Sequence, residues 1–378
     1  MDYRHRLWGI GAGPKNTEGV AVKSTVGVGC DRRLRGSIWS WGLFVWAGLA
    51  TTVATGAEPV RIGILGLDNY QSVAFTQLFH DPQAAGDLAG IKVTAAFPDE
   101  PSTDIAESVE NLPKWVQSMK DFQVPLVDSV DKVLAQSDAV LVMSVDGRRH
   151  RPLAEAAIRS GKRTYIGRPM AASLEDVAAI LRTAQEAQVP LWTSSQHRFS
   201  PGFSGMRNHP EVGKVLGCDV YGGCPMVPHH SDFFWHAVHS LETLYTIMGP
   251  GCETVRCTST PQAESITCVW RDGRVGTYRG IKQGAVKYSA TVFGDQGVSI
   301  AGVYGHGVPV KGVAPTDDKY MGYEGIAIEI ARFAKGGAVP VTPAETLELY
   351  AVLEAARESR AKQGAPVSVA EILRRVAP

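Results

Sequence analysis

The sequence predicts an α/β fold: a Rossmann-like, doubly wound parallel sheet, followed by an α+β domain with an open, mostly antiparallel sheet. Three observations support this prediction. Apolar strand segments alternate with amphipathic helical segments from residue 60 to residue 193, which is the order of a parallel sheet with crossover helices. The strand segment over 139–145 is apolar on both faces, as expected beneath two layers of helices. Beyond residue 250, four strand segments follow one another without helices, which favours antiparallel hairpins.

The first half contains alternating strands and helices with recognisable ends. Ser173 precedes the helix over 173–188, and Glu175 and Asp176 lie in its first turn, which is typical of a helix start. The helix over 105–122 has an irregular start near Pro113. The expected strands cover residues 60–66, 91–97, 124–127, 139–145, 163–167 and 189–194. The other expected helices cover 72–80, 129–136 and 151–161.

The second half begins with a strand over 213–223 and a long helix over 232–249. The dipeptide Asp272-Gly273 lies between two strand segments and is a strong hairpin signal. Its four consecutive strands cover 252–259, 264–272, 274–281 and 286–294, and two helices over 325–335 and 343–362 end the chain. We therefore predict a Rossmann-like dinucleotide-binding domain over 58–194 and an α+β substrate and oligomerisation domain over 195–378.

Composition narrows the classes of partner. The chain has 378 residues, enough for two domains, and 44% of them are hydrophobic. Lys plus Arg equals Asp plus Glu at 38 each, so the net charge of zero gives no indication of a nucleic-acid or anionic-membrane partner.

The first 57 residues have the pattern of a signal peptide. Arginines between residues 32 and 35 precede an apolar run over 38–54, and small residues at 55 and 57 follow it. We expect cleavage after Ala57, export to the periplasm or beyond, and no stable membrane span; the alternative is an uncleaved N-terminal anchor. The pair Arg32-Arg33 is compatible with the twin-arginine route.

Export implies an oxidising compartment, and five cysteines follow the expected cleavage point. Cys257 and Cys268 lie in neighbouring predicted strands and could pair. The alternative is that these cysteines are buried free thiols.

The turn after the first strand departs from the G-x-G-x-x-G pattern that binds a dinucleotide. Gly66 is the first glycine, but Asp68 and Gln71 occupy the second and third positions. A carboxylate at residue 68 would repel a phosphate, and it could also cap the following helix in place of the phosphate. The alternative is a cofactor shifted outward, with contacts from Asn69 and Tyr70.

Four segments, in this order, resemble the glucose–fructose oxidoreductase / inositol dehydrogenase / MocA (Gfo/Idh/MocA) family. They are the strand and turn over 63–68, SVDGRRH over 144–150, GRPMAASLEDV over 167–177 and WHAVHSLETLYTIMG over 235–249. The resemblance covers about residues 60–375. It implies hydride transfer between NAD or NADP and a sugar, cyclitol or related polyol, and it also implies a homo-oligomer formed through the open sheet.

The resemblance implies a set of cofactor-binding residues. His150 matches a family histidine beneath the nicotinamide, and Asp146 takes the position of a family asparagine. The alternative for His150 is a helix-terminal residue without chemistry, and Arg148 and Arg149 are expected to be solvated. The full expected set is Gly63, Gly66, Asp68, Asn69, Asp99 as the ribose-binding acid, Asp146, His150 and Pro169.

The resemblance also implies catalytic residues, with two departures. Arg168 replaces the family lysine before Pro169; an arginine remains charged, so it can bind a hydroxyl or a carboxylate but cannot act as a base. His239 matches the family acid/base, and Glu242, one turn later, is expected to fix its tautomer. The usual acid before this histidine is Trp235.

Other residues near this histidine are candidates for the substrate site or for a metal. The resemblance implies that Arg198 contacts the substrate, and His236, on the same helical stripe as His239, is a further candidate; His197 is a weaker one. The alternative for this stripe is a polar surface at a domain interface. A metal site is the alternative for a group within eleven residues: His229, His230, Asp232, His236 and His239. No standard zinc spacing matches, so we assign no metal. Because the cofactor turn and the lysine are altered, the alternative function is a non-catalytic secreted carbohydrate-binding protein.

Overall fold

The computed structural model describes residues 58–302 and 322–376, which belong to one compact unit, Gly56–Pro378. Our predictions of a signal peptide, its cleavage point and a twin-arginine pair lie outside the described residues. Within these residues no helix combines the length and the apolar character needed to cross a bilayer.

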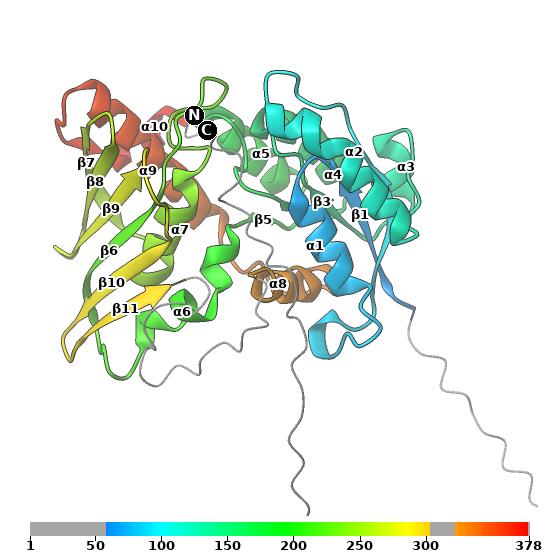
Figure 1. Ribbon diagram of the computed structural model, residues 1–378, viewed down its shortest axis with the longest axis horizontal. Coiled ribbons are helices and arrows are strands. Elements are labelled where there is room, and N and C mark those ends of the chain that lie inside the picture. The colour runs from blue at the N-terminus through cyan, green and yellow to red at the C-terminus, as the bar shows by residue number, and fades with distance from the viewer. Residues whose placement is uncertain (1–57, 303–321, 377–378) are drawn as a thin grey trace, which may run out of the picture. The chain divides into compact units, whose positions relative to one another are not determined.

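The first half is the predicted parallel sheet, with strand order β2-β1-β3-β4-β5 (Figure 1). Because β2 and β3 lie on opposite sides of β1, the carboxyl ends of β1 and β3 form the crevice where such folds bind ligands. The expected strand over 124–127 forms only a single parallel bridge, between Leu126 and Ala96. The strands are β1 (Val60–Leu65), β2 (Ile91–Phe97), β3 (Ala139–Val142), β4 (Arg163–Ile166) and β5 (Leu191–Thr193).

Helices α2, α3 and α5 begin within one residue of the predicted start, whereas α1 begins two residues earlier and α4 four residues earlier than predicted. Ser129 and Ser173 accept hydrogen bonds at the starts of α3 and α5, and α2 runs through Pro113 without interruption. The helices are α1 (Tyr70–Phe79), α2 (Ala106–Asp121), α3 (Val130–Ala135), α4 (Gly147–Arg159) and α5 (Leu174–Glu186), with a short 3₁₀ turn, η1 (Gly86–Leu88).

The second sheet has the order β11-β10-β6-β9-β8-β7-β12, and of its pairs only β6 with β9 is parallel. The chain turns between β8 and β9 at the predicted Asp272-Gly273 hairpin, where Gly273 has a φ of 83°. Strands β11 and β12 were not predicted. The strands are β6 (Val215–Gly223), β7 (Cys252–Ser259), β8 (Ala263–Trp270), β9 (Val275–Ile281), β10 (Ser289–Gly294), β11 (Val298–Gly302) and β12 (Val367–Ser368).

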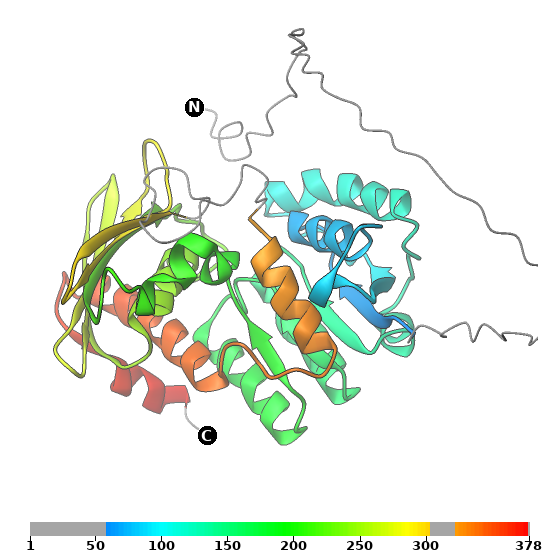
Figure 2. The same ribbon diagram turned by 90° about the horizontal axis from the view of Figure 1, so that it is seen from below.

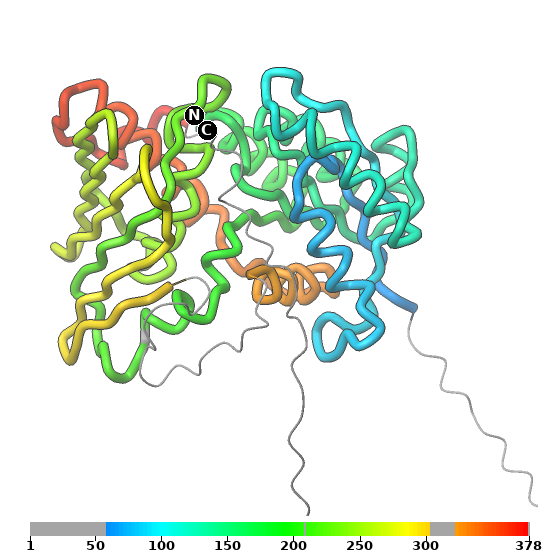
Figure 3. Tube along the Cα trace, in the orientation of Figure 1, coloured from blue at the N-terminus to red at the C-terminus, as the bar shows by residue number. Residues whose placement is uncertain are grey.

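Two C-terminal helices connect the halves. Helix α8 (Glu324–Ala334) packs on the parallel sheet beside α1 (Figure 2). Its N-cap residue, Tyr323, contacts Phe75 of α1. Helix α9 (Pro343–Ala361) contacts α5 and β5 as well as α7 and β7, and α10 (Val369–Val376), which was not predicted, follows it. Figure 3 shows the same path, from the blue first half into the second sheet and back to the parallel sheet at orange α8.

The remaining helical segments lie next to the junction between the two sheets. They are η2 (Gln196–Phe199), α6 (Pro201–Ser204), η3 (Met206–Asn208) and α7 (Ala237–Met248). Helix α7 begins five residues later than predicted, so His236 is its N-cap residue rather than part of the helix. The five cysteines beyond residue 57 are free and buried. In the strand register Cys257 faces Ile266 and Cys268 faces Val255, so the suggested pair is not formed and the free-thiol alternative holds.

Candidate active site

The turn after β1 keeps the backbone of a dinucleotide-binding turn at its first glycine. Gly66 has a φ of 90°, and a Cβ there would lie 2.6 Å from the backbone nitrogen of Ser144, so only glycine fits. Gly63, which we expected at the cofactor, lies inside β1. A Cβ on it would lie 2.2 Å from Ser137 Oγ, so this glycine allows the close packing of β1 against the end of α3.

Asp68 occupies the crevice between the ends of β1 and β3. Its side chain is buried; Oδ1 accepts a hydrogen bond from the Val145 backbone N–H at 2.8 Å and Oδ2 accepts one from Ser108 Oγ at 2.5 Å. Burial raises the pKa of this carboxyl group. The expectation that Asp68 caps α1 is wrong: the cap is Asn69, whose Oδ1 accepts from the Gln71 N–H at 3.0 Å.

Buried polar atoms near the start of α1 could bind a ligand. Asn69 Nδ2, Gln71 Oε1 and Trp115 Nε1 are buried and have no hydrogen-bond partner among the described residues. Buried polar atoms without partners are costly, so they indicate a missing partner. Together with the N-terminal end of α1, these atoms suit the phosphate and ribose groups of a dinucleotide. The turn therefore fits a dinucleotide although Asp68 and Gln71 replace two glycines of the pattern.

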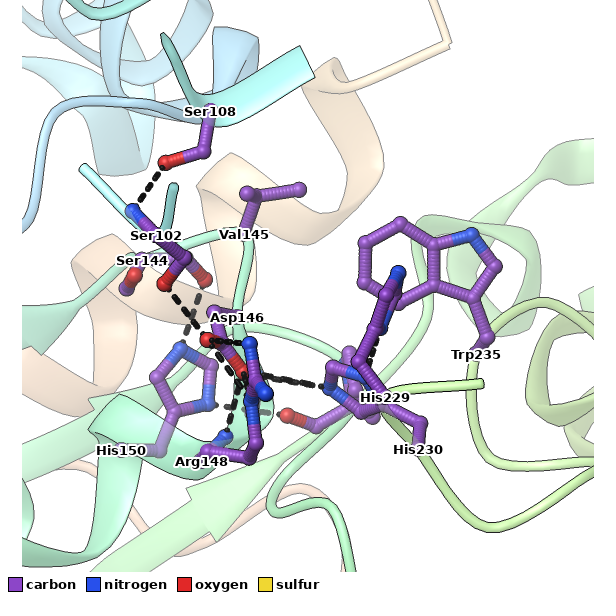
Figure 4. Close-up of polar contacts among 12 residues, drawn as sticks. Ser102, Ser108, Ser144, Val145, Asp146, Arg148, His150, His229, His230 and Trp235 are labelled. Atoms are coloured by element: carbon purple, nitrogen blue, oxygen red, sulfur yellow. Dashed lines mark hydrogen bonds and ion pairs between the residues drawn. The ribbon is translucent and has the colours of Figure 1, made fainter. Parts of the chain in front are cut away.

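The loop after β3 is held by a polar network around Asp146 (Figure 4). Asp146 caps α4, accepts from Ser102 Oγ at 2.5 Å and pairs with Arg148 at 2.8 Å. Burial acts to raise its pKa, but the hydrogen bonds from Arg148 and Ser102 prevail and lower it to about 2. Asp146 is therefore ionised, and its carboxylate oxygens are engaged by the start of α4, Ser102 and Arg148.

A second loop, over 226–236, meets this network from the other half of the chain. The Gly147 N–H donates to His230 Nε2 at 3.0 Å, so His230 is neutral and its Nδ1, 2.6 Å from His229 Nδ1, donates to that nitrogen. Burial lowers the pKa of His230 to about 4, in agreement with this assignment. In Figure 4 His229, His230 and Trp235 face Asp146 across the junction of the two halves.

Two arginines that we expected to be solvated form ion pairs. Arg148 contacts Asp104 at 2.7 Å as well as Asp146, and Arg149 contacts Asp99 at 2.5 Å. Asp99 lies just beyond β2, with a φ of 60°. The candidate ribose-binding acid is therefore placed at the expected edge, but it carries its own counter-ion.

His150 connects two loops of the parallel sheet. It is fully buried, with Nδ1 2.8 Å from the Pro169 carbonyl oxygen and Nε2 2.7 Å from the Ser144 carbonyl oxygen. Burial lowers its pKa, and the two carbonyl groups oppose that effect. Both ring nitrogens are occupied, so this arrangement supports the alternative role of a helix-terminal residue without chemistry.

Arg168 lies in the loop after β4, before a cis peptide bond to Pro169. Its Nη1 donates to the Trp235 carbonyl oxygen at 3.4 Å, while its Nε is buried and has no partner among the described residues. The positive charge of Arg168 acts on three imidazoles, those of His197, His236 and His239.

His239, the predicted acid/base, is buried in the first turn of α7. Its Nδ1 lies 2.6 Å from Ser195 Oγ, whereas the predicted partner Glu242 is turned elsewhere. Glu242 accepts from Ser194 Oγ at 2.5 Å, from the Ser195 N–H at 2.7 Å and from Arg198 at 2.7 Å. The expectation that Glu242 fixes the tautomer of His239 is wrong, because Glu242 holds the loop that carries Ser195.

Arg198, a predicted substrate contact, pairs with two carboxylates of the protein. It is 8% exposed and pairs with both Glu242 and Glu345, each at 2.7 Å. Its position after β5 was predicted, but its charge is already neutralised within the protein. It supports the loop that carries Ser195.

The imidazoles around His239 are held neutral. Burial and the charge of Arg168 lower the pKa values of His197 and His236 to about 3, and both lower the pKa of His239 well below 6.5. The ring centroid of His197 lies 4.9 Å from that of His239 and 4.7 Å from that of Tyr288. His197 Nδ1 and His236 Nδ1 are buried without partners among the described residues. The three imidazoles are therefore polar but uncharged, and Arg168 supplies a positive charge beside them.

The five residues of the metal alternative are not gathered at one point. His229 and His230 contact the Asp146 loop, Asp232 pairs with Arg360 at 2.7 Å, and His236 and His239 lie near Arg168. Over residues 58–302 and 322–376, no group of three metal-ligating side chains is present.

Comparison with known proteins identifies the family. Residues 60–195 match the model GFO_IDH_MocA, described as an oxidoreductase family with an NAD-binding Rossmann fold. Over these residues the chain has the NAD-binding Rossmann domain of the Gfo/Idh/MocA family. The family match covers the parallel sheet and ends at Ser195, so the site residues on α7 lie beyond it.

Curated relatives within the family match over short segments. The chain is 29% identical over 87 residues to a myo-inositol dehydrogenase, Hyg17, of Streptomyces leeuwenhoekii, covering 23% of this chain and 27% of that protein. It is 30% identical over 107 residues to a 1,5-anhydro-D-fructose reductase of Ensifer adhaerens, covering 27% of this chain and 32% of that protein. These matches thus span about a quarter to a third of the relatives' length.

Solved structures share the fold over most of the chain. A putative myo-inositol dehydrogenase from Sinorhizobium meliloti 1021 superposes with a TM-score of 0.66 at 19% identity, over 82% of this chain and 99% of that one. A scyllo-inositol dehydrogenase from Lactobacillus casei, with bound NAD(H) and scyllo-inositol, has a TM-score of 0.63 at 15% identity, over 83% and 100%. At these identities the likeness establishes the fold.

Three residues of this family member's site were not predicted. Ser195 carries a positional signal, since it follows β5 at the carboxyl edge of the sheet where ligands bind. Tyr288 and Ser108 carry no such signal, because each reaches the site only through the packing of a distant loop or helix.

Proposed function

We propose that this chain is an NAD(P)-dependent oxidoreductase that transfers a hydride between the nicotinamide and a hydroxyl-bearing carbon of a sugar, cyclitol or related polyol. The family supports this reaction class. One observation carries the proposal: around a neutral His239, at the junction of the two halves, lie buried atoms of Arg168, His197 and His236 that have no partner among the described residues. Such atoms suit the hydroxyl groups of a carbohydrate-like molecule.

The residues that would hold the dinucleotide are those of the carboxyl edge. They are the Gly66 turn with Asn69, the pair Asp99 and Arg149, and the loops of Asp146 and Pro169. When bound, the nicotinamide supplies the hydride acceptor or donor for the reaction. Calorimetric titration with each dinucleotide would distinguish NAD from NADP as the cofactor.

His239 is the proposed acid/base. In the oxidation direction its Nε2 takes the hydroxyl proton while the hydride leaves the same carbon, so that the C–O–H group becomes a carbonyl. Nε2 is available because Nδ1 is engaged by Ser195. Arg168 remains charged and orients the substrate beside His239.

The direct test is cofactor reduction across a panel of sugars, cyclitols and their oxidised forms, followed at about 340 nm. We expect turnover with at least one member and a loss of about 100-fold or more in His239→Ala. If His239→Ala turns over the substrate as fast as an active wild type does, His239 is not the acid/base.

The second candidate function is a secreted carbohydrate-binding protein without catalysis. One observation favours it: Asp68 binds the Val145 N–H within the crevice that a pyrophosphate would share. Absorbance and mass analysis of the denatured protein for nicotinamide, with calorimetric titration of NAD and NADP, separates the two. Absence of binding to either dinucleotide would favour the second candidate.

We further propose that the protein is exported. The basic, apolar and small-residue pattern before Glu58 supports this proposal. N-terminal sequencing of the mature protein should begin at or near Glu58, and an intact apolar run on the exported chain would contradict cleavage.

A further inference from the structure

Arg168 differs from the other arginines of the site. Arg148, Arg149 and Arg198 each pair with at least one carboxylate. For Arg168 the described residues provide only a carbonyl oxygen, that of Trp235 at 3.4 Å, and its Nε remains buried without a partner. The guanidinium is therefore partly desolvated and has no counter-ion in this part of the chain.

The surroundings of Arg168 do not neutralise it. The three imidazoles that feel its charge are themselves neutral, since their pKa values are lowered by burial and by Arg168. Glu242 is the nearby carboxylate on α7, and its oxygens are already bound to Arg198, Ser194 and the Ser195 N–H. Among the described residues, the site thus carries one positive charge without a counter-ion.

An unbalanced, half-buried cation is unfavourable unless a ligand supplies the opposite charge. A guanidinium has a planar fork of donors that matches a carboxylate through two parallel hydrogen bonds, which a lysine ammonium cannot reproduce. Near the same cation, His197 Nδ1 and His236 Nδ1 also have no partner in the described part of the chain, and they suit neighbouring hydroxyl groups.

We propose that the substrate of this site is a polyhydroxy acid, such as an aldonate or a uronate, whose carboxylate binds Arg168. The inference rests on the proposed function for the site of the reaction, and it narrows the substrate from polyols in general to sugar acids. The hydroxyl carbon that reacts faces His239, while the carboxylate sets the orientation.

The test is calorimetric binding of matched pairs, D-gluconate against D-glucitol and D-galacturonate against D-galactose, with and without NAD. We expect the acid of at least one pair to bind at least tenfold more tightly than its neutral partner. Arg168→Gln should abolish that preference, and Arg168→Lys should keep part of it. Arg182→Gln, on the exposed side of α5, is the matched control and should keep it in full.

The outcomes separate this inference from the proposed function. Equal or tighter binding of the neutral partners, an acid preference that survives Arg168→Gln, or no binding of any acid would overturn the inference. Reduction of NAD(P) by neutral polyols alone would overturn it too, while leaving the proposed function intact. The protein could also prefer acids through Arg168 and yet bind neither dinucleotide. That result would support the anion site and contradict the proposed oxidoreductase activity. A melting curve checks the fold of each variant.

Discussion

Ser195 Oγ lies 2.6 Å from Nδ1 of His239, and this contact replaces the carboxylate–histidine pair that the sequence predicts. A carboxylate only accepts, so it would hold a proton on Nδ1, whereas a hydroxyl group both donates and accepts. His239 can therefore present Nε2 either as a lone pair, to take a proton from an alcohol, or as an N–H, to give one to a carbonyl. The Ser195 N–H is fixed in turn by Glu242 at 2.7 Å.

Replacing Ser195 tests this contact. In Ser195→Ala the His239 ring loses its partner, so we expect kcat to fall by about tenfold to a hundredfold, with a smaller change in KM. Ser195→Thr keeps the hydroxyl group and should retain most of the activity. Steady-state rates of both variants measure the effect, and equal losses in the two would contradict a role for the hydroxyl.

The pH dependence of turnover follows from the position of Arg168. Because burial and Arg168 lower the pKa of His239 well below 6.5, the base is already deprotonated at neutral pH. In the oxidation direction kcat/KM should rise with pH only in the acid range and be level above about 6.5. Removing the cation in Arg168→Gln raises the pKa of His239, so the rise should move to higher pH. A wild-type rise centred at or above 6.5 would contradict the assignment.

Asp68 is expected to stabilise the fold of the crevice. Asp68→Ala leaves the Val145 N–H and the Ser108 hydroxyl buried without an acceptor, which we expect to cost about 1–3 kcal/mol of unfolding free energy. Asp68→Asn keeps one acceptor and should cost less. Asp81→Ala, at an exposed turn, is the control for loss of a carboxylate. Urea unfolding compares them, and equal stability of Asp68→Ala and wild type would contradict this role.

The buried neutral histidines make stability depend on pH. The folded-state pKa of His230 is about 4 and those of His197 and His236 are about 3, all below the ordinary value of about 6.5. The unfolded chain therefore binds protons first, so this stabilisation is complete above about 6.5 and is lost as the pH falls toward the folded-state values. Each histidine contributes a slope of up to about 1.4 kcal/mol per pH unit. Urea unfolding at several pH values should show a shallower slope for His230→Gln, and an unchanged slope would contradict its neutral state.

The outer face of the second sheet is expected to join two copies of the chain. Val275, Phe293, Val298 and Ile300 are 44%, 37%, 64% and 45% exposed on neighbouring strands, which is a large apolar surface for a monomer. Sedimentation velocity should show a dimer or larger assembly that Val298→Lys combined with Ile300→Lys shifts toward the monomer. Val109→Lys, equally exposed at 45% on α2, is the control. A wild-type monomer at all concentrations would remove the proposal.

The sequence predicted helix starts and hairpins well where the residues that form them are only a few positions apart. Ser173 with Asp176 marks the start of α5, and Asp272-Gly273 marks a hairpin, because capping and turn formation depend on residues a few positions apart. The segment over 124–127 failed as a strand because its apolar residues do not determine whether a neighbouring strand lies within reach.

Sequence position alone predicted that Arg168 and His239 belong near one edge of the fold, since each follows a strand or opens a helix at a place set by the order of elements. Ser195, which was not predicted, has the same positional signal because it follows β5. Only the tertiary structure decided which of these side chains pair. Glu242 lies one turn from His239 in the helix yet bonds to Arg198, Ser194 and Ser195, because the loop after β5 brings a stronger set of donors to its carboxylate. Within residues 58–302 and 322–376 Arg168 has no counter-ion for the same reason, since Glu242, the carboxylate of α7, is already paired with Arg198.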